Sequence, residues 1–123
     1  MSSQHLNEVA LVGKLSKEPA VKPLPSGRTA LEWRLVVLRP RDGQASRPGA
    51  HDTIDCVSYV EEIQRAATEW QKGDLIAVRG ALRRHFWEST ASGSRASRYD
   101  VEVWEALPLI PATLLDLADP ADP

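Results

Sequence analysis

The residues best suited to bind a ligand lie in a strand predicted at residues 75–87. Alternation along this strand places Arg83, His85 and Trp87 on one face, and Arg84 and Phe86 on the other. Cationic groups attract phosphates and an indole ring can stack on an unpaired base, so the first face suits a single-stranded nucleic acid. A hairpin with solvated arginines and one core tryptophan would explain the same residues equally well.

Charge is distributed unevenly along the chain of 123 residues, although its formal net charge is only −2. Basic side chains concentrate in residues 14–47 and 79–98, whereas every charged residue from Asp100 onward is acidic. A basic body with an acidic end can attract a polyanion despite the negative total. The candidate phosphate ligands are Lys14, Lys22, Arg41, Arg79, Arg83, Arg84, His85, Arg95 and Arg98.

Hydrophobic periodicity predicts five strands and one helix that would position these side chains. The strands are expected at Val9–Leu15, Thr29–Leu38, 53–60, 75–87 and 98–105. The helix is expected at 61–71, with Gly73 as its C-terminal cap. Its buried stripe would consist of Ile63, Ala66, Ala67 and Trp70.

Prolines, glycines and small polar residues mark the connections. Three prolines within residues 16–28 exclude a helix there and confine any strand to a sheet edge. Gly13 inside the first strand indicates a bulge or a close backbone approach. Residues 39–51 are expected to form a basic loop, and residues 89–94 a mobile hairpin tip.

The strand pattern weakens after Glu105. The domain is therefore expected to span residues 1–106, followed by a short acidic, proline-rich tail at 107–123 whose end is disordered. Three strands, one short helix and two more strands predict an all-β fold. This order matches the five-stranded Greek-key barrel of the OB-fold, with its helix between strands three and four.

Several other classes of protein are disfavoured by the sequence. The single cysteine, Cys56, excludes an internal disulfide and fits a reducing cytoplasm. No apolar run approaches the length of a membrane span, which is about 20 residues. The histidines and Cys56 lack the spacing of a zinc site, and no glycine-rich phosphate loop or catalytic carboxylate pair is present. We therefore expect a protein without a catalytic residue, a metal or another cofactor.

Five segments, in matching order and spacing, resemble the bacterial single-stranded DNA-binding protein family over residues 6–106. They are NEVALVGKL at 7–15, Pro19 with PSG at 25–27, TIDCVSY at 53–59, KGD at 72–74 and RGALR at 79–83. The resemblance implies a homotetramer, formed through the first strand, that wraps single-stranded DNA over its barrel faces. It also implies a cytoplasmic, nucleoid-associated role in replication, recombination or repair, with no small-molecule substrate.

Particular residues match positions that the family uses. Tyr59 and Trp87 fall where the family places aromatic residues that stack on bases. The residues at or near its commonly basic positions are Lys14, Lys22, Arg79 and Arg83.

Other positions depart from the family pattern. Thr53 and Arg41 stand at or near positions where many members carry an aromatic residue, and Asp55 places an acid on the expected DNA face. Since a stacked base contributes about 1–3 kcal/mol, weaker or less extensive wrapping is expected. The short tail lacks the aromatic tip through which the family recruits other proteins. The chain thus resembles a short-tailed second paralogue of the actinobacterial type.

Two other functions remain open at the level of sequence. An OB-fold adaptor that binds proteins and has lost its DNA affinity would explain Thr53, Asp55 and the negative total charge. RNA is also possible, because stacking and phosphate contacts do not exclude a 2′-hydroxyl.

Overall fold

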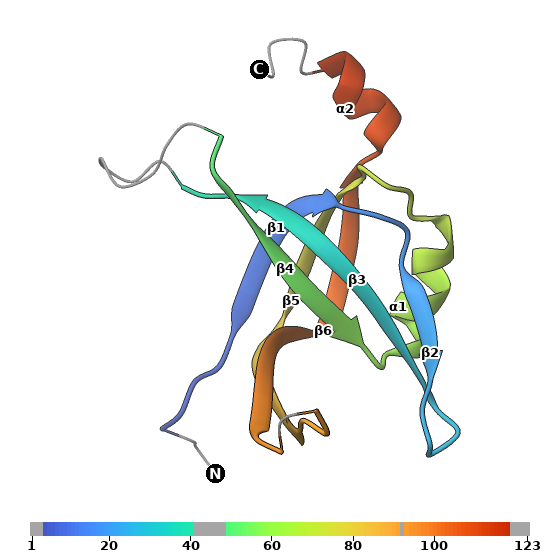
Figure 1. The fold of residues 1–123 in the computed structure, drawn as a ribbon. Helices are drawn as coiled ribbons and strands as arrows, with labels where there is room; N and C mark the ends of the chain where they lie inside the picture. Colours follow the sequence, from blue (N-terminus) through green and yellow to red (C-terminus); the bar gives the residue numbers. More distant parts are fainter. Residues whose placement is uncertain (1–3, 41–48, 92, 119–123) are drawn as a thin grey trace.

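The computed structural model describes residues 4–40, 49–91 and 93–118, which form one curved sheet that closes into a barrel (Figure 1). The strands are β1 (Val9–Leu15), β2 (Ala20–Pro23), β3 (Thr29–Leu38), β4 (His51–Ser58), β5 (Leu75–Glu88) and β6 (Arg95–Ile110). The helices are α1 (Glu61–Ala66), which continues into a 3-10 turn at Ala67–Glu69, and α2 (Ala112–Ala118). The sheet order is β1-β5-β6-β4-β3-β2, and pairing of β1 with β3 closes it.

This arrangement confirms the predicted all-β barrel with its helix between the third and fourth long strands. β1 and β3 have the bounds that the apolar alternation indicated. The structure has one strand more than the five that were predicted. This strand, β2, is short, ends at Pro23 and lies at the sheet edge. An edge position is where a strand tolerates proline, because one side of its backbone needs no partner.

The core lies between the barrel strands and α1. Leu31, Trp33 and Leu35 of β3 are at most 4% exposed, as their alternation predicted. The Trp33 and Trp70 rings meet edge to face, with centroids 5.5 Å apart and planes at 81°. Such a pair contributes about 0.5–1.5 kcal/mol beyond its buried area. Trp70 therefore anchors the end of the helical segment to the barrel.

Gly13 allows the barrel to close. β1 pairs with β5 from Val9 to Lys14 and then with β3 at Lys14 and Leu15. A Cβ atom at Gly13 would lie 2.7 Å from the Val36 carbonyl oxygen, closer than real Cβ contacts come. The predicted close backbone approach is confirmed.

The helix prediction was too long. α1 ends at Ala66, the chain tightens into the 3-10 turn, and Trp70 has an extended backbone with φ −76° and ψ 140°. This change of direction lets the Trp70 ring pack against Trp33. Ala66, predicted to be buried, is exposed, whereas Ile63 and Ala67 are buried. Gly73 lies in the following turn, where its amide donates to the Leu15 carbonyl oxygen rather than capping α1.

The predicted strand bounds at 53–60 and 98–105 were also wrong. β4 begins at His51, and β6 runs from Arg95 to Ile110 because β5 supplies pairing partners along its whole length. At Pro108, β6 pairs with β5 on one side and with no strand of the described residues on the other, so a missing N–H is tolerated. α2 was not expected from the sequence. Within the described residues, no helix is long and apolar enough to cross a membrane.

Candidate nucleic-acid interface

The hairpin of β5 and β6 extends beyond its pairing with the rest of the barrel. β1 pairs with β5 as far as Gly80, and β4 pairs with β6 at Val101 and Glu102. In the part of the chain that the structure describes, segment 81–88 pairs only with β6, and segment 95–100 pairs only with β5. We call this segment the finger. Asn7 holds its base by accepting a hydrogen bond from the Leu82 amide (2.9 Å) and donating one to the Leu82 carbonyl oxygen (2.7 Å).

Cross-strand register sorts the finger's side chains onto two faces. The inner face continues from the core residue Val101 and carries Leu82, Arg84, Phe86, Glu88, Arg95, Ser97 and Tyr99. The outer face carries Arg83, His85, Trp87, Ala96, Arg98 and Asp100. The alternation predicted for β5 is therefore confirmed, and β6 adds two cationic side chains, Arg98 on the outer face and Arg95 on the inner.

A groove on the barrel surface adjoins the outer face of the finger. We call it the outer groove; its lining residues are Lys17, Ala20, Lys22, Glu32, Trp33, Arg34, Asp55, Cys56, Val57, Arg98 and Asp100. It crosses β2, β3, β4 and β6, and Arg98 and Asp100 belong both to it and to the finger. His85 extends the same surface, since its Nε2 lies 2.9 Å from Asp100 Oδ1.

Carboxylates neutralise most of the cationic groups on this surface. On the barrel, Lys22 pairs with Glu32 at 2.9 Å, and Arg34 pairs with Asp55 at 2.8 Å. Phosphates that enter the outer groove must therefore compete with carboxylates already in place. Such exposed pairs are worth about 0–1 kcal/mol each, so a polyanion can displace them.

The finger's outer face shows the same pattern. Arg83 pairs with Glu102 at 3.5 Å, and Arg98 reaches Glu32 at 4.0 Å. His85 approaches Asp100, whose side chain is almost fully buried. Together with Asp55, these carboxylates reduce the positive potential that the basic windows of the sequence suggested.

Two aromatic side chains that the sequence predicted to stack on bases, Tyr59 and Trp87, do not line the outer groove itself. Tyr59 is half-buried, and burial raises the pKa of its phenol, with Glu102 and Asp100 adding to the effect. The phenol therefore stays neutral and does not repel a phosphate. Trp87 lies further along the finger's outer face and is 47% exposed. The exposed ring of Trp87 is large and flat enough to stack on a base.

The remaining predicted site residues are spread over other surfaces. Arg79 pairs with Glu8 at 2.9 Å, away from the outer groove. Lys14 is exposed on the side of β1 that also carries Ala10 and Val12. Arg84 and Arg95 lie on the finger's inner face, and Arg41 lies outside the described residues.

Sequence reasoning missed three residues of these surfaces. Arg34 lies in the outer groove opposite Asp55 in the β3–β4 register, which only the strand pairing reveals. Phe86 and Tyr99 are 48% and 53% exposed on the finger's inner face. Alternation places these two aromatic side chains on the same hairpin face as Arg84 and Arg95, so the sequence pattern alone could have identified them.

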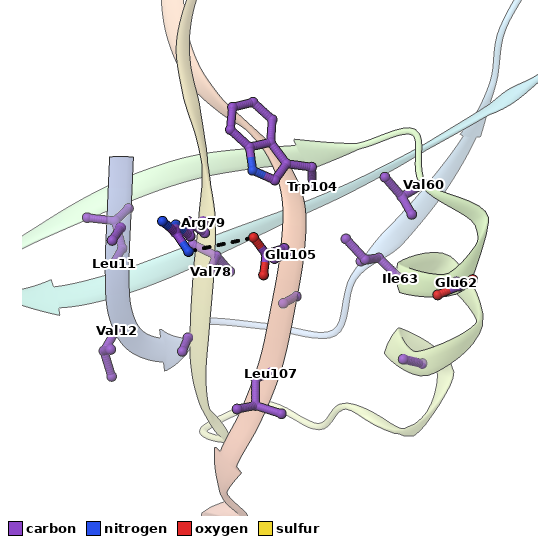
Figure 2. A pocket seen from close by; sticks show the side chains of 14 residues that line it. Leu11, Val12, Val60, Glu62, Ile63, Val78, Arg79, Trp104, Glu105 and Leu107 are labelled. Carbon is purple, nitrogen blue, oxygen red and sulfur yellow. Dashed lines mark ion pairs between the residues drawn. The ribbon is translucent and has the colours of Figure 1, made fainter. Parts of the chain in front are cut away.

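A second hollow, with mostly apolar walls, lies between β1, β5, β6 and α1 (Figure 2). Leu11, Val12, Ile63 and Leu107 contribute to its walls, and Trp104 lies at the edge of the same surface with 44% exposure. The Arg79–Glu105 ion pair, at 3.8 Å, crosses the hollow. Trp104 therefore lies outside the core.

These surfaces give little support to nucleophilic catalysis or to metal binding. Cys56 is 2% exposed, and burial raises the pKa of its thiol to about 12. The thiol is therefore protonated at neutral pH and unreactive as a nucleophile. Within residues 4–40, 49–91 and 93–118, no three His, Cys, Asp or Glu side chains gather as a metal site would require.

Comparison with known proteins agrees with this geometry. The model of the single-strand binding protein family matches residues 6–108. Single-stranded DNA-binding protein A of Bacillus subtilis is 33% identical over 84 residues, which are 68% of this chain and 48% of that protein. Single-stranded DNA-binding protein 1 of Synechocystis is 29% identical over 98 residues, covering 80% of this chain and 78% of that one.

A solved structure shares the fold. The chain described as a Plasmodium falciparum SSB complex with ssDNA superposes with a TM-score of 0.72 at 21% identity, covering 89% of this chain and 99% of that one. By contrast, this chain spans about half the length of several curated relatives it matches, between 48% and 51%.

Proposed function

Because this chain belongs to the single-strand binding protein family, we propose that it binds single-stranded DNA without sequence preference and without a catalytic step. One observation carries the proposal. The outer groove continues onto the finger through Arg98 and Asp100, so basic side chains form one surface that leads to the exposed Trp87 ring, with the half-buried Tyr59 near Asp100 and Glu102.

Binding would proceed by exchange of ionic partners. Phosphates of the strand would replace Glu32 and Glu102 as partners of Lys22, Arg98 and Arg83, while bases stack on Trp87 and Tyr59. Because each of these cationic groups exchanges a carboxylate partner for a phosphate, the net electrostatic gain per contact is small. We therefore expect moderate affinity and a preference for unpaired bases.

Salt dependence provides a direct test. Fluorescence anisotropy of a labelled oligo(dT) should show binding at low salt, with a log–log slope of about −0.7 for each phosphate neutralised. A duplex of the same length should compete poorly, because its bases cannot stack on Trp87 or Tyr59. A slope near zero, or equal competition by the duplex, would contradict the proposal.

We further propose that the protein acts as a homotetramer assembled through β1. Support comes from the exposed side of β1 and the neighbouring apolar hollow (Figure 2), where Val12 is 48% and Leu107 is 60% exposed. Contiguous apolar surface of this kind is typical of protein interfaces.

Introducing a charged residue at this surface tests whether the protein assembles through it. Val12→Asp should dissociate the oligomer, because it places a carboxylate in an apolar contact, and light scattering after gel filtration would measure the loss of mass. Val21→Asp is a matched control, since Val21 is also exposed (58%) but lies on the edge strand β2. Equal oligomer size for both variants and the unmodified protein would exclude assembly through β1.

The cellular role follows from the family. We place the protein with cytoplasmic DNA during replication, recombination or repair, and its assignment to a short-tailed second paralogue stays a prediction. The carboxylates of the outer groove and the apolar hollow favour one second candidate, an adaptor that binds proteins through the hollow and has lost most DNA affinity. RNA binding stays open, and a labelled oligo(U) titration would measure it.

A further inference from the structure

The finger's inner face carries an ordered stack of arginine and aromatic side chains. The Arg84 and Arg95 guanidinium carbons lie 4.6 Å and 4.4 Å from the centroid of the Phe86 ring. Arg84 also lies 5.1 Å from the centroid of the Tyr99 ring. Its Nε and Nη2 donate to Ser97 Oγ at 3.3 Å and 3.2 Å. Cation–π contacts and these hydrogen bonds thus fix the position of the guanidinium groups.

The two faces of the finger differ in how their cations are partnered. On the outer face, Arg83, His85 and Arg98 each have a carboxylate within 4.0 Å. On the inner face, neither Arg84 nor Arg95 has a carboxylate that close among the residues that the structure describes. Glu88 is the cross-strand neighbour of Arg95 but forms no ion pair with it within 4.0 Å, so the guanidinium groups of the inner face are more available to an external anion than those of the outer face.

This difference determines on which face of the finger a phosphate contact contributes more binding free energy. A phosphate that binds Arg83 must displace Glu102, so one ion pair is exchanged for another. A phosphate that binds Arg84 or Arg95 displaces water and mobile ions, so no existing ion pair with a carboxylate of the described residues is lost. Arg84 uses Nε and Nη2 on Ser97 and keeps its Nη1 donors for a phosphate, and an arginine held against an aromatic ring loses less side-chain freedom on binding.

We propose that the finger's inner face is a second contact for the single strand, and that it contributes more phosphate-derived affinity than the outer face does. Arg84 and Arg95 would hold phosphates. Tyr99, which is 53% exposed, would offer a ring edge or face to a base. The inference rests on the proposed function, and it adds that the strand contacts the finger on both sides.

Two double variants with equal charge change separate the faces. Arg84→Gln with Arg95→Gln removes the inner pair, and Arg83→Gln with Arg98→Gln removes the outer pair. Anisotropy with labelled oligo(dT) at low salt should show a loss of about tenfold or more for the inner variant, and a smaller loss for the outer one. The log–log salt slope should become shallower by about 1.4 for the inner variant, which corresponds to two phosphates.

The comparison is stringent because the outer variant leaves Glu102 and Glu32 without these cations, and their repulsion should increase its loss. A third variant, Phe86→Leu, keeps both inner arginines but removes the ring that orders them. It should weaken binding without reducing the salt slope. Melting temperatures of all variants would show that they remain folded.

The possible outcomes are distinct. Equal losses, or a greater loss for the outer variant, would overturn the inference while leaving the proposed function intact. If the inner variant keeps its DNA affinity but changes oligomer mass, the inner face is a contact between copies of the chain, and the inference is wrong. If the unmodified protein binds no oligo(dT) at all, the proposed function and the inference fail together.

Discussion

Replacing Trp87 by alanine is expected to weaken binding to single-stranded DNA by about 1–3 kcal/mol, which is the usual contribution of a stacked base. Trp87 is 47% exposed on the finger's outer face, so its removal takes no buried contact from the core. Folding stability and oligomer size should therefore remain unchanged. Anisotropy with labelled oligo(dT), together with light scattering, would measure both effects.

Trp104 provides the control for this variant. It is exposed to a similar extent, 44%, but lies beside the apolar hollow instead of on the finger (Figure 2). Trp104→Phe keeps an apolar ring at that place and should leave DNA affinity unchanged. If Trp87→Ala instead alters oligomer mass while DNA affinity stays the same, Trp87 is an interface residue, and the proposed path of the strand is wrong.

Replacing Gly80 by alanine should destabilise the protein by about 3 kcal/mol, near the upper end of the usual cost of overpacking. Gly80 lies at a register shift between β5 and β6, immediately before the finger. A Cβ atom there would clash with the Glu102 carbonyl oxygen and would lie 2.9 Å from the Val103 Cα. Backbone atoms cannot move aside as a flexible side chain can, so the two strands must separate.

Chemical denaturation would measure this loss, with Gly27→Ala as the matched control. Gly27 has φ +88° in the turn after β2, and a Cβ atom there would meet nothing within 4 Å. Its replacement should cost only the backbone strain of a left-handed residue, about 1–2 kcal/mol. Equal destabilisation by the two variants would show that the sheet adapts at the Gly80 register shift.

The barrel was predictable from the sequence because its long strands alternate clearly between apolar and polar residues. Leu31, Trp33 and Leu35 identified β3, and the order of strands around one helix identified the OB-fold. The ends of β6 were not predictable in the same way. Residues 106–110 lack alternation and contain Pro108, and their pairing with β5 stabilises them as a strand.

The candidate site was predictable only in part, because alternation gives the face of a residue but not its partner. Arg83 and Trp87 were correctly assigned to one face of β5. The carboxylates that neutralise Arg83 and Arg34 come from other strands, and only the register brings Glu102 and Asp55 to them. Only the structure therefore shows that, among the described residues, the arginines of the finger's outer face pair with carboxylates and those of its inner face do not.

Tryptophan fluorescence during titration with poly(dT), at low salt and again at high salt, tests most directly whether single-stranded DNA occupies the outer groove. Trp33 lines the outer groove but, like Trp70, is only 4% exposed and has no open ring face for stacking, so quenching by a stacked base would come from Trp87 or Trp104. We expect strong quenching that salt reverses, that persists in Trp104→Phe and that is lost in Trp87→Phe. No quenching, with no comigration of protein and DNA, would contradict single-stranded DNA binding and direct attention to a protein partner at the apolar hollow.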